Sequence, residues 1–192
     1  RSSRDKNSFE LIIASGNLFS LSQDFVKDAL VLLNGIQPVG VVTMILDRLD
    51  LIPAIGAAAG IDPLIPVQVL QKGDLMNLGT FICAASEAKT GTILLKVKIN
   101  YECGKSSDFK IIKGDLINIS VGEHENVELV LQPVHKCDIG MGPGKGGKIR
   151  VKGGRMGVVI DARGRPLHMP KDKGTRVEMI KKWESSLRRL NP

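Results

Sequence analysis

The chain has 192 residues, of which 43% are hydrophobic, 24% charged and only 4% aromatic, with a net charge of +7. This length is sufficient for one full domain or two small ones with an aliphatic core. Because no apolar run reaches about 18 residues, we expect no membrane span, and the polar residues 1–6 predict no signal peptide. The three cysteines lack a CxxC spacing, which indicates reduced thiols in a cytoplasmic protein.

The positive charge is distributed unevenly. Residues 139–192 carry 14 Lys and Arg against 4 Asp and Glu, whereas residues 1–138 carry 13 against 16. A basic segment is a feature of nucleic-acid-binding proteins, but this one has no aromatic residue among its glycines and no recognised binding motif. We therefore do not expect nucleic acid as a partner, and favour a solvated basic face or one that meets an acidic protein.

The opening residues predict an α/β unit. Residues 10–14 form a short apolar run, typical of a buried strand, that ends in the turn Ser15-Gly16-Asn17. A helix is expected over residues 23–33 with Ser22 as its N-cap, and a second apolar strand over residues 40–46. A strand, a helix and a strand joined by short connections predict parallel pairing in a sheet that is buried on both faces.

Two further helices are expected to complete this unit, which we assign to residues 1–74. Residues 51–60 are rich in small side chains and have Pro53 in the first turn, which predicts a helix packed closely against the sheet. Asp62-Pro63 predicts the start of another helix, which extends to about residue 69.

Residues 75–170 differ in character, and we interpret them as a β domain. Their apolar segments are short, β-branched and separated by turn residues at spacings typical of a β-sandwich or barrel. Strands are predicted over residues 80–84, 91–99, 109–112, 116–121, 127–131, 149–152 and 157–161. The domain boundary is expected near residues 71–77.

A glycine-rich segment, residues 138–166, contains nine glycines with cations between them. Consecutive N–H groups in such a segment can form a concave anion site, and residues 142–148 satisfy the G-x-x-x-x-G-K part of a phosphate loop. However, Ile149 occupies the position of the magnesium-binding Ser or Thr, and the residues after it alternate as in a strand. We favour a glycine-rich β connection over a nucleotide phosphate loop.

Residues 171–192 predict a basic C-terminal helix. Thr175, with Glu178 three residues later, forms a capping-box pattern. An apolar stripe that docks this helix on the rest of the chain is predicted from Val177, Ile180, Trp183, Leu187 and Leu190.

Few residues carry candidate chemistry. His135, Cys137 and Asp138 bring together an imidazole, a thiol and a carboxylate, but no second cluster supplies further ligands, so we predict no metal site and no catalytic residue. Asp47 and Asp161 each end a predicted strand, and we favour a role in turns over a role in a binding site. The stronger candidate is Ser15-Gly16-Asn17, because ligands of open α/β sheets bind at the carboxyl ends of parallel strands.

Several segments resemble known proteins. Residues 11–19, with the sequence Leu-Ile-Ile-Ala-Ser-Gly-Asn-Leu-Phe, resemble the adenosine motif of the actin-like ATPase superfamily. Residues 32–41, Leu46-Asp47, residues 77–80, residues 138–140 and the run from Ile160 to Leu167 (Ile-Asp-Ala-Arg-Gly-Arg-Pro-Leu) look like the glutamate mutase L family. Its members are encoded beside adenosylcobalamin-dependent aminomutases and are unrelated to mismatch repair. The resemblance covers nearly the whole chain, as the C-terminal part of a longer protein, and the missing initiator Met leads us to expect a fragment.

The resemblance implies the end of an actin-like ATPase α/β lobe, followed by the β domain and the C-terminal helix. The family's function is that of an ATP-dependent chaperone or reactivating factor, which exchanges damaged cofactor on a cobalamin-dependent mutase such as glutamate mutase. Ser15, Gly16 and Asn17 are then the cofactor-binding residues beside adenosine, although Ala14 and Asn17 stand where the family usually has glycine.

The phosphate-gripping motifs belong to the first half of such proteins. The resemblance therefore implies that ATP binds only to the full-length protein, as a possible ATPase, and that the fragment alone binds no cofactor and is not catalytic. The implied partners are the mutase or other domains of the full-length protein. The alternative is a noncatalytic protein-binding or scaffolding module without nucleotide contact.

Overall fold

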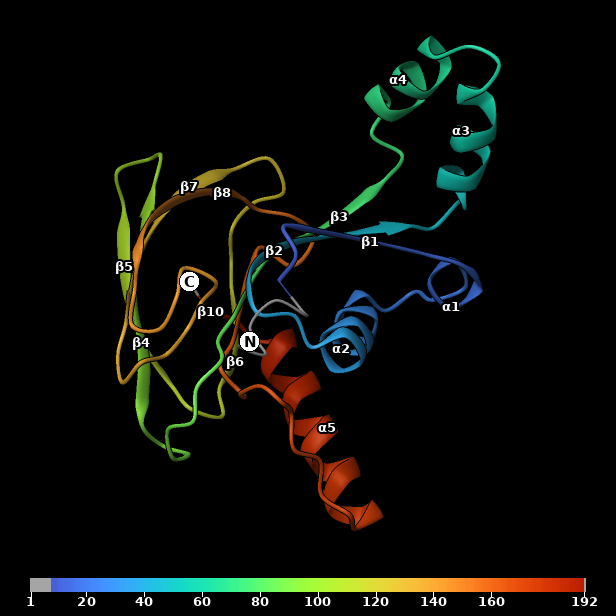
Figure 1. Ribbon diagram of the computed structural model, residues 1–192. Coiled ribbons are helices and arrows are strands. Elements are labelled where there is room, and N and C mark those ends of the chain that lie inside the picture. The colour runs from blue at the N-terminus through green and yellow to red at the C-terminus, as the bar shows by residue number, and fades with distance from the viewer. Residues whose placement is uncertain (1–7, 192) are drawn as a thin grey trace.

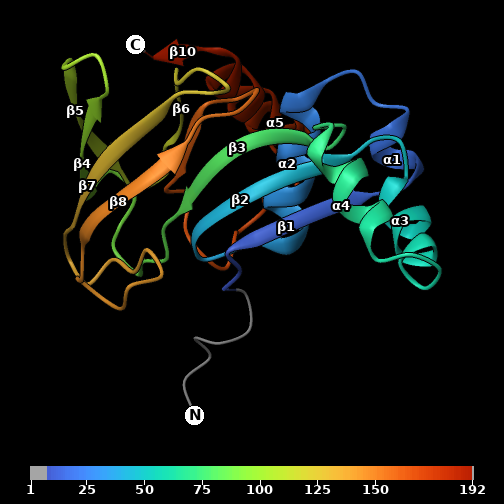
Figure 2. The same ribbon diagram turned by 90° about the horizontal axis from the view of Figure 1, so that it is seen from above.

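The computed structural model describes residues 8–191 and shows a mixed α/β protein with two sheets and a C-terminal helix (Figure 1). A six-stranded sheet forms the central layer. The four-stranded sheet packs on one of its faces, and helices α2 (Phe25–Ile36) and α5 (Lys173–Arg188) pack on the other (Figure 2).

The six-stranded sheet joins the beginning, the middle and the end of the chain. β1 pairs with β2 in parallel, which confirms the pairing predicted from the sequence. β2 pairs antiparallel with β3, and β3 pairs in parallel with β9. The carboxyl ends of β1 and β2 therefore lie at one end of the sheet, and those of β3 and β9 at the opposite end. In spatial order the strands are β1 (Leu11–Ser15), β2 (Gly40–Asp47), β3 (Met76–Cys83), β9 (Val158–Asp161), β6 (Leu116–Ile119) and β10 (Leu190–Asn191).

The four-stranded sheet is antiparallel throughout. Its strands, in spatial order, are β5 (Ser106–Ile112), β4 (Ile93–Tyr101), β7 (Asn126–Pro133) and β8 (Gly147–Lys152). With β3, β6 and β9, every strand predicted between residues 75 and 170 is present, and the two sheets enclose a common core. The expected boundary near residues 71–77 does not separate the sheets, because β3, β9 and β6 continue the sheet that β1 and β2 begin.

Side chains alternate along the central strands, so this sheet is buried on both faces where the layers overlap. Phe81 and Val159 face the helices, whereas Ile82 and Ile160 face the four-stranded sheet. All four are 0% exposed. This double burial explains why β3 and β9 are nearly continuous apolar runs.

The prediction that Ser22 caps the first long helix is wrong. Asp24 is the N-cap of α2, and its carboxylate accepts hydrogen bonds from the N–H groups of Val26 and Lys27. An ionised carboxylate is a stronger acceptor for these N–H groups than a hydroxyl. Ser22 instead accepts a hydrogen bond from the N–H of Asp24.

The two middle helices form a hairpin that projects away from the sheets (Figure 1). These are α3 (Leu51–Ala59) and α4 (Leu64–Gln71), both predicted from the sequence. The expectation that the first of them packs closely against the sheet is wrong, because neither helix contains a buried residue. α3 begins just beyond the end of β2 and so extends past the sheet rather than over its face.

The C-terminal helix is present, with changes at both ends. Asp172 is its N-cap and accepts a hydrogen bond from the N–H of Thr175, which lies inside the helix. Trp183 and Leu187 of the predicted stripe are buried, whereas Val177 is 43% exposed and does not dock. The chain then leaves the helix and forms β10 beside β6, so Leu190 is not part of the helical stripe. Between residues 8 and 191, no helix has both the length and the apolar content needed to cross a bilayer.

Candidate functional site

The predicted binding residues lie together at the carboxyl end of β1. Ser15 ends the strand, Gly16 has a φ of 104°, and Asn17 begins the short helix α1 (Asn17–Ser20). Glycine adopts this backbone conformation readily, and a Cβ added at Gly16 would meet no atom within 4 Å. The turn is therefore accessible, at the position where open α/β sheets bind their ligands.

A carboxylate occupies the polar groups of this turn. Asp50 Oδ1 accepts hydrogen bonds from Ser15 Oγ at 2.8 Å and from Gly16 N at 2.9 Å. Asp47, fully buried at the end of β2, accepts hydrogen bonds from two N–H groups in the first turn of α3 at 2.8 Å each. Carboxylates in this position repel a phosphate group, whereas they are compatible with an uncharged base or ribose.

Exposed apolar side chains lie on β1, on α1 and on the hairpin of α3 and α4. We define the outer apolar surface as Leu11, Ile13, Leu18, Leu21, Ile61, Leu64, Val67 and Leu70, from β1, α1, α4 and the neighbouring loops. Their exposed fractions range from 41% for Ile13 to 86% for Ile61. On β1, Ile12 and Ala14 are buried against the helices, while Leu11 and Ile13 point to the uncovered face of the sheet. The prediction that this sheet is buried on both faces is therefore wrong for β1, because β1 is an edge strand that the four-stranded sheet does not cover. Exposed apolar surface of this kind marks a site of interaction.

A second polar site lies at the opposite end of the sheet, where β9 ends. Asp161 is fully buried and binds Arg163 and Arg165, whose side chains are 2% and 5% exposed. Arg163 donates to both carboxylate oxygens, from Nε at 2.9 Å and from Nη2 at 2.7 Å, and Arg165 Nη2 donates to Oδ2 at 2.7 Å. Burial raises the pKa of Asp161, but the hydrogen bonds and charges of the arginines outweigh it and hold the pKa below its usual value.

Residues from distant parts of the chain complete this cluster. Arg163 Nη1 donates to Asn34 Oδ1 at 2.9 Å, and its Cζ lies 4.3 Å from the centre of the Trp183 ring. Arg165 Nε donates to the carbonyl of Pro38 at 3.0 Å. The arginines therefore connect the end of β9 to α2, to the loop after it and to α5. The cluster is positioned by burial and by hydrogen bonds that satisfy both guanidinium groups.

The interpretation of Asp161 as a turn residue is confirmed, since its Oδ1 accepts a hydrogen bond from the N–H of Arg163 at 3.1 Å, but it misses the second role of the carboxylate, which holds two buried arginines. The signal that could have found this role is the spacing Asp161, Arg163, Arg165. Alternate residues of an extended chain share one side, and a carboxylate is the partner that allows guanidinium groups to be buried.

The glycine-rich segment contains a nest of N–H groups, but a side chain of the same segment occupies it. Asp138 Oδ1 accepts hydrogen bonds from the N–H groups of Gly140 at 2.9 Å and Gly142 at 3.0 Å. Residues 147–152 form β8 rather than a helix. The preference for a β connection over a phosphate loop is thus confirmed in its secondary structure.

His135 and Cys137 do not face one another. His135 is exposed in a turn with a φ of 50°, whereas Cys137 is fully buried. Across residues 8–191, no group of three or more His, Cys, Asp or Glu side chains is arranged to hold a metal ion.

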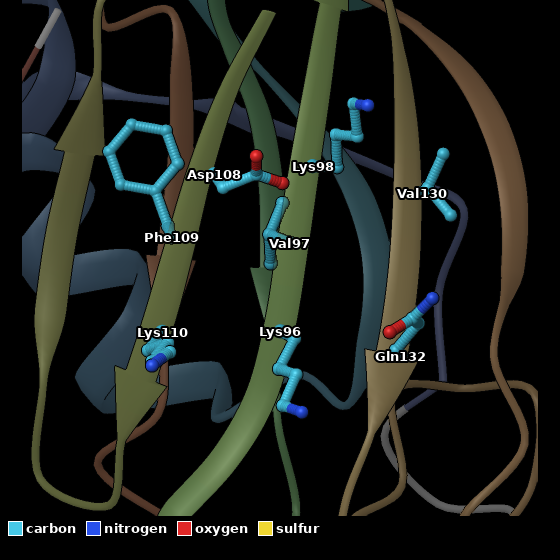
Figure 3. A pocket seen from close by; sticks show the side chains of 8 residues that line it. All are labelled: Lys96, Val97, Lys98, Asp108, Phe109, Lys110, Val130 and Gln132. Carbon is cyan, nitrogen blue, oxygen red and sulfur yellow. The ribbon is translucent and has the colours of Figure 1, made fainter.

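A hollow of about 570 Å³ lies over β4, β5 and β7, and Figure 3 shows the side chains around it. Lys96, Lys98 and Lys110 line it together with Asp108. Lys96 and Lys110 are register partners on neighbouring strands, an arrangement in which like charges repel. All three lysines are exposed, so water screens them, and we interpret this hollow as a solvated basic sheet face.

The fold and these sites define a mixed α/β protein with an accessible strand-end turn and a buried arginine cluster. Neither a protein-family model, nor a curated protein, nor a solved structure matches the chain.

Proposed function

We propose that this chain is the C-terminal part of a cytoplasmic protein of the glutamate mutase L type. In this proposal the full-length protein is an actin-like ATPase that acts as an ATP-dependent chaperone or reactivating factor for a cobalamin-dependent aminomutase. Residues 1–74 are the end of the ATPase lobe, and Ser15, Gly16 and Asn17 contact the adenosine.

The observation that supports this proposal most directly is the accessible Gly16 turn at the carboxyl end of the parallel pair β1 and β2. An adenosine group can approach the backbone there because no Cβ intervenes. Asp47 and Asp50 disfavour phosphate at this turn, which is consistent with a site that contacts the nucleoside and leaves the phosphates to other parts of the protein.

The outer apolar surface supports a second part of the proposal. Its side chains are exposed and belong to neither core of the described chain. A further lobe of the same protein, or the mutase, would bury these side chains, and burial of about 25 cal/mol per Å² of apolar surface would stabilise that contact.

Titration of the full-length protein with ATP tests the adenosine contact. Replacement Asn17→Gly restores the glycine that the family usually has, and we expect tighter ATP binding. Replacement Asn17→Leu places a larger group at the turn, and we expect ATP binding that is weaker by about tenfold, or about 1.4 kcal/mol. Ser106→Leu on the exposed end of β5 is the control and should leave the affinity unchanged. Equal ATP affinities for all variants would refute the adenosine role.

A pull-down of the neighbouring aminomutase tests the partner. The full-length protein is expected to retain the mutase in at least one nucleotide state, and failure in the apo, ADP and ATP states counts against the assignment.

A noncatalytic scaffolding module is the second candidate, because Asp50 already occupies the N–H of Gly16 and the hydroxyl of Ser15. Such a module would bind the mutase equally well without nucleotide. Nucleotide-independent binding together with no ATP affinity would favour it over the ATPase.

A further inference from the structure

A cavity of about 630 Å³ lies beside the arginine cluster, at the end of the sheet opposite the Gly16 turn. Its walls come from residues 86–90, the turn after β5, residues 163–168 and one side of α5. This volume is in the range of sites that hold a small organic molecule. The function proposed above makes no use of it.

The cavity is lined by an excess of cations. Lys89, Lys113 and Lys182 line it together with Arg163 and Arg165, whereas Glu87 is the one carboxylate in its lining among the described residues. The two arginines share the single carboxylate of Asp161. Among the ion pairs found in residues 8–191, none includes any of these three lysines. The lining therefore carries an excess of positive charge, on the half-buried Lys113 and on the exposed Lys89 and Lys182.

Lys113 is the most constrained of these lysines. Its Nζ donates a hydrogen bond to the carbonyl of Ser86. A Cβ added at Gly164 would lie 2.5 Å from that Nζ, so glycine at this position makes room for the ammonium group beside Arg165. Burial lowers the pKa of Lys113, and the charge of Arg165 acts in the same direction. A bound anion would relieve both effects.

Part of the remaining wall is apolar, and Ser86, Thr90 and His168 contribute polar groups to the rest. Trp183 and Met179 from α5, with Pro166 and Leu167 from the loop after β9, line the cavity beside the cations. A ligand that fits has several negative charges at one end and an apolar or planar body at the other. Ammonium groups bind phosphate well as point charges, and several of them suit a group with more than one negative charge.

We propose that this cavity binds a phosphorylated small molecule, with Lys113 and Lys182 on the phosphate and the Trp183 side of the cavity against its body. Four separate segments of the chain form the walls of one hollow, which favours a small molecule over the backbone of a nucleic acid, because that backbone would follow a continuous basic stripe. The site is separate from the proposed adenosine turn, because β1 and β9 end at opposite ends of the sheet.

Isothermal titration calorimetry of the 192-residue chain with inorganic pyrophosphate tests the site. Because this chain lacks the phosphate-binding motifs of the proposed ATPase, any binding reports on the cavity and not on an ATP site. We expect binding that weakens as the salt concentration rises. Lys182→Gln and Lys113→Met should each weaken binding by about tenfold, the loss expected for one hydrogen bond to a charged group. Lys181→Gln is the matched control, since it removes the same charge from the adjacent exposed residue of α5 that is outside the lining.

Unequal effects of Lys182→Gln and Lys181→Gln support the proposal. Equal effects, or no binding of pyrophosphate by the unaltered chain, would overturn it. A single-stranded oligonucleotide that binds tightly and is not displaced by pyrophosphate would also overturn it, in favour of a nucleic-acid surface. The melting temperature of each variant shows whether Lys113→Met destabilises the fold. If it does, the comparison of Lys182→Gln with Lys181→Gln alone decides the outcome.

Discussion

The two ends of the six-stranded sheet are built in opposite ways. At the carboxyl ends of β1 and β2, Asp50 holds the exposed Ser15-Gly16 turn and Asp47 caps the first turn of α3, and exposed apolar side chains lie on β1 and α1. At the carboxyl ends of β3 and β9, one aspartate holds two arginines inside the protein. The first end leaves apolar side chains exposed, whereas the second pairs its two buried arginines with Asp161 and has the proposed cation-lined cavity beside them.

This difference bears on how much each end contributes to the stability of the fold. A buried charge requires a partner, because its transfer from water is costly without one. Arg163 meets this requirement with partners from α2, β9 and α5. The hairpin of α3 and α4 has no comparable side-chain contacts with the sheets, and none of its helical residues is buried. Variants at the two ends should therefore differ in their effect on stability.

The largest difference is expected between Asp161→Asn and Asp50→Asn, which make the same chemical change at the two ends. Asp161→Asn leaves two buried arginines without a negative charge and should lower the free energy of unfolding by about 3–5 kcal/mol. Asp50→Asn keeps an oxygen acceptor at an exposed turn and should change the free energy of unfolding by less than about 0.5 kcal/mol. Urea unfolding of the two variants measures both values.

The pH dependence sharpens this test. The pKa of Asp161 is lowered in the folded state, so its stabilisation is complete above the unfolded-state pKa of about 3.9 and is lost as the pH falls toward the folded value. The stability difference between the unaltered chain and Asp161→Asn should therefore shrink below about pH 4. A difference that is the same at pH 7 and pH 3 would contradict the ion cluster.

A second comparison uses leucines on two helices. Leu33 on α2 is 0% exposed, and Leu33→Ala should lower the free energy of unfolding by about 2–5 kcal/mol. Leu64 on α4 is 65% exposed, and Leu64→Ala should change it by less than about 0.5 kcal/mol. Urea unfolding at several protein concentrations measures both. A large, concentration-dependent effect of Leu64→Ala would mean that a second copy of the chain covers the hairpin.

The features that sequence patterns predicted well are those fixed by local periodicity. The β-branched segments between residues 75 and 170 form strands because alternate residues face a core. The apolar run of residues 10–14 forms a parallel strand with β2 for the same reason. The position of Ser15, Gly16 and Asn17 followed from that strand, since a turn must come where the run ends.

Features set by contacts between distant residues could not be predicted in this way. The exposure of α3 depends on where β2 ends, and its apolar composition alone suggested a packed helix. The role of Asp161 depends on Asn34, Pro38 and Trp183, which are far from it in sequence. Ser22 and Asp24 lie only two residues apart, and both can cap a helix. Asp24 is the N-cap of α2 because its carboxylate is a stronger acceptor than the hydroxyl of Ser22.

The smallest expected effect on stability concerns the three cysteines. At neutral pH their thiols differ in reactivity, not in what they contribute to the free energy of unfolding. Cys103 is exposed, whereas Cys83 and Cys137 are buried, and burial raises their pKa values to about 12 and about 11. A thiol reagent at pH 8 should label Cys103 rapidly in the native chain and all three cysteines in denaturant, because the thiolate is the reactive form. Cys103→Ser should remove the rapid reaction.

Since the folded pKa values of the buried thiols are raised, their contribution to stability should be lost as the pH rises above about 8.5, where the unfolded chain ionises first. Rapid labelling of two or three thiols in the native chain would show that the region around Cys83, beside the arginine cluster, opens readily, and would contradict the contrast between the two ends of the sheet.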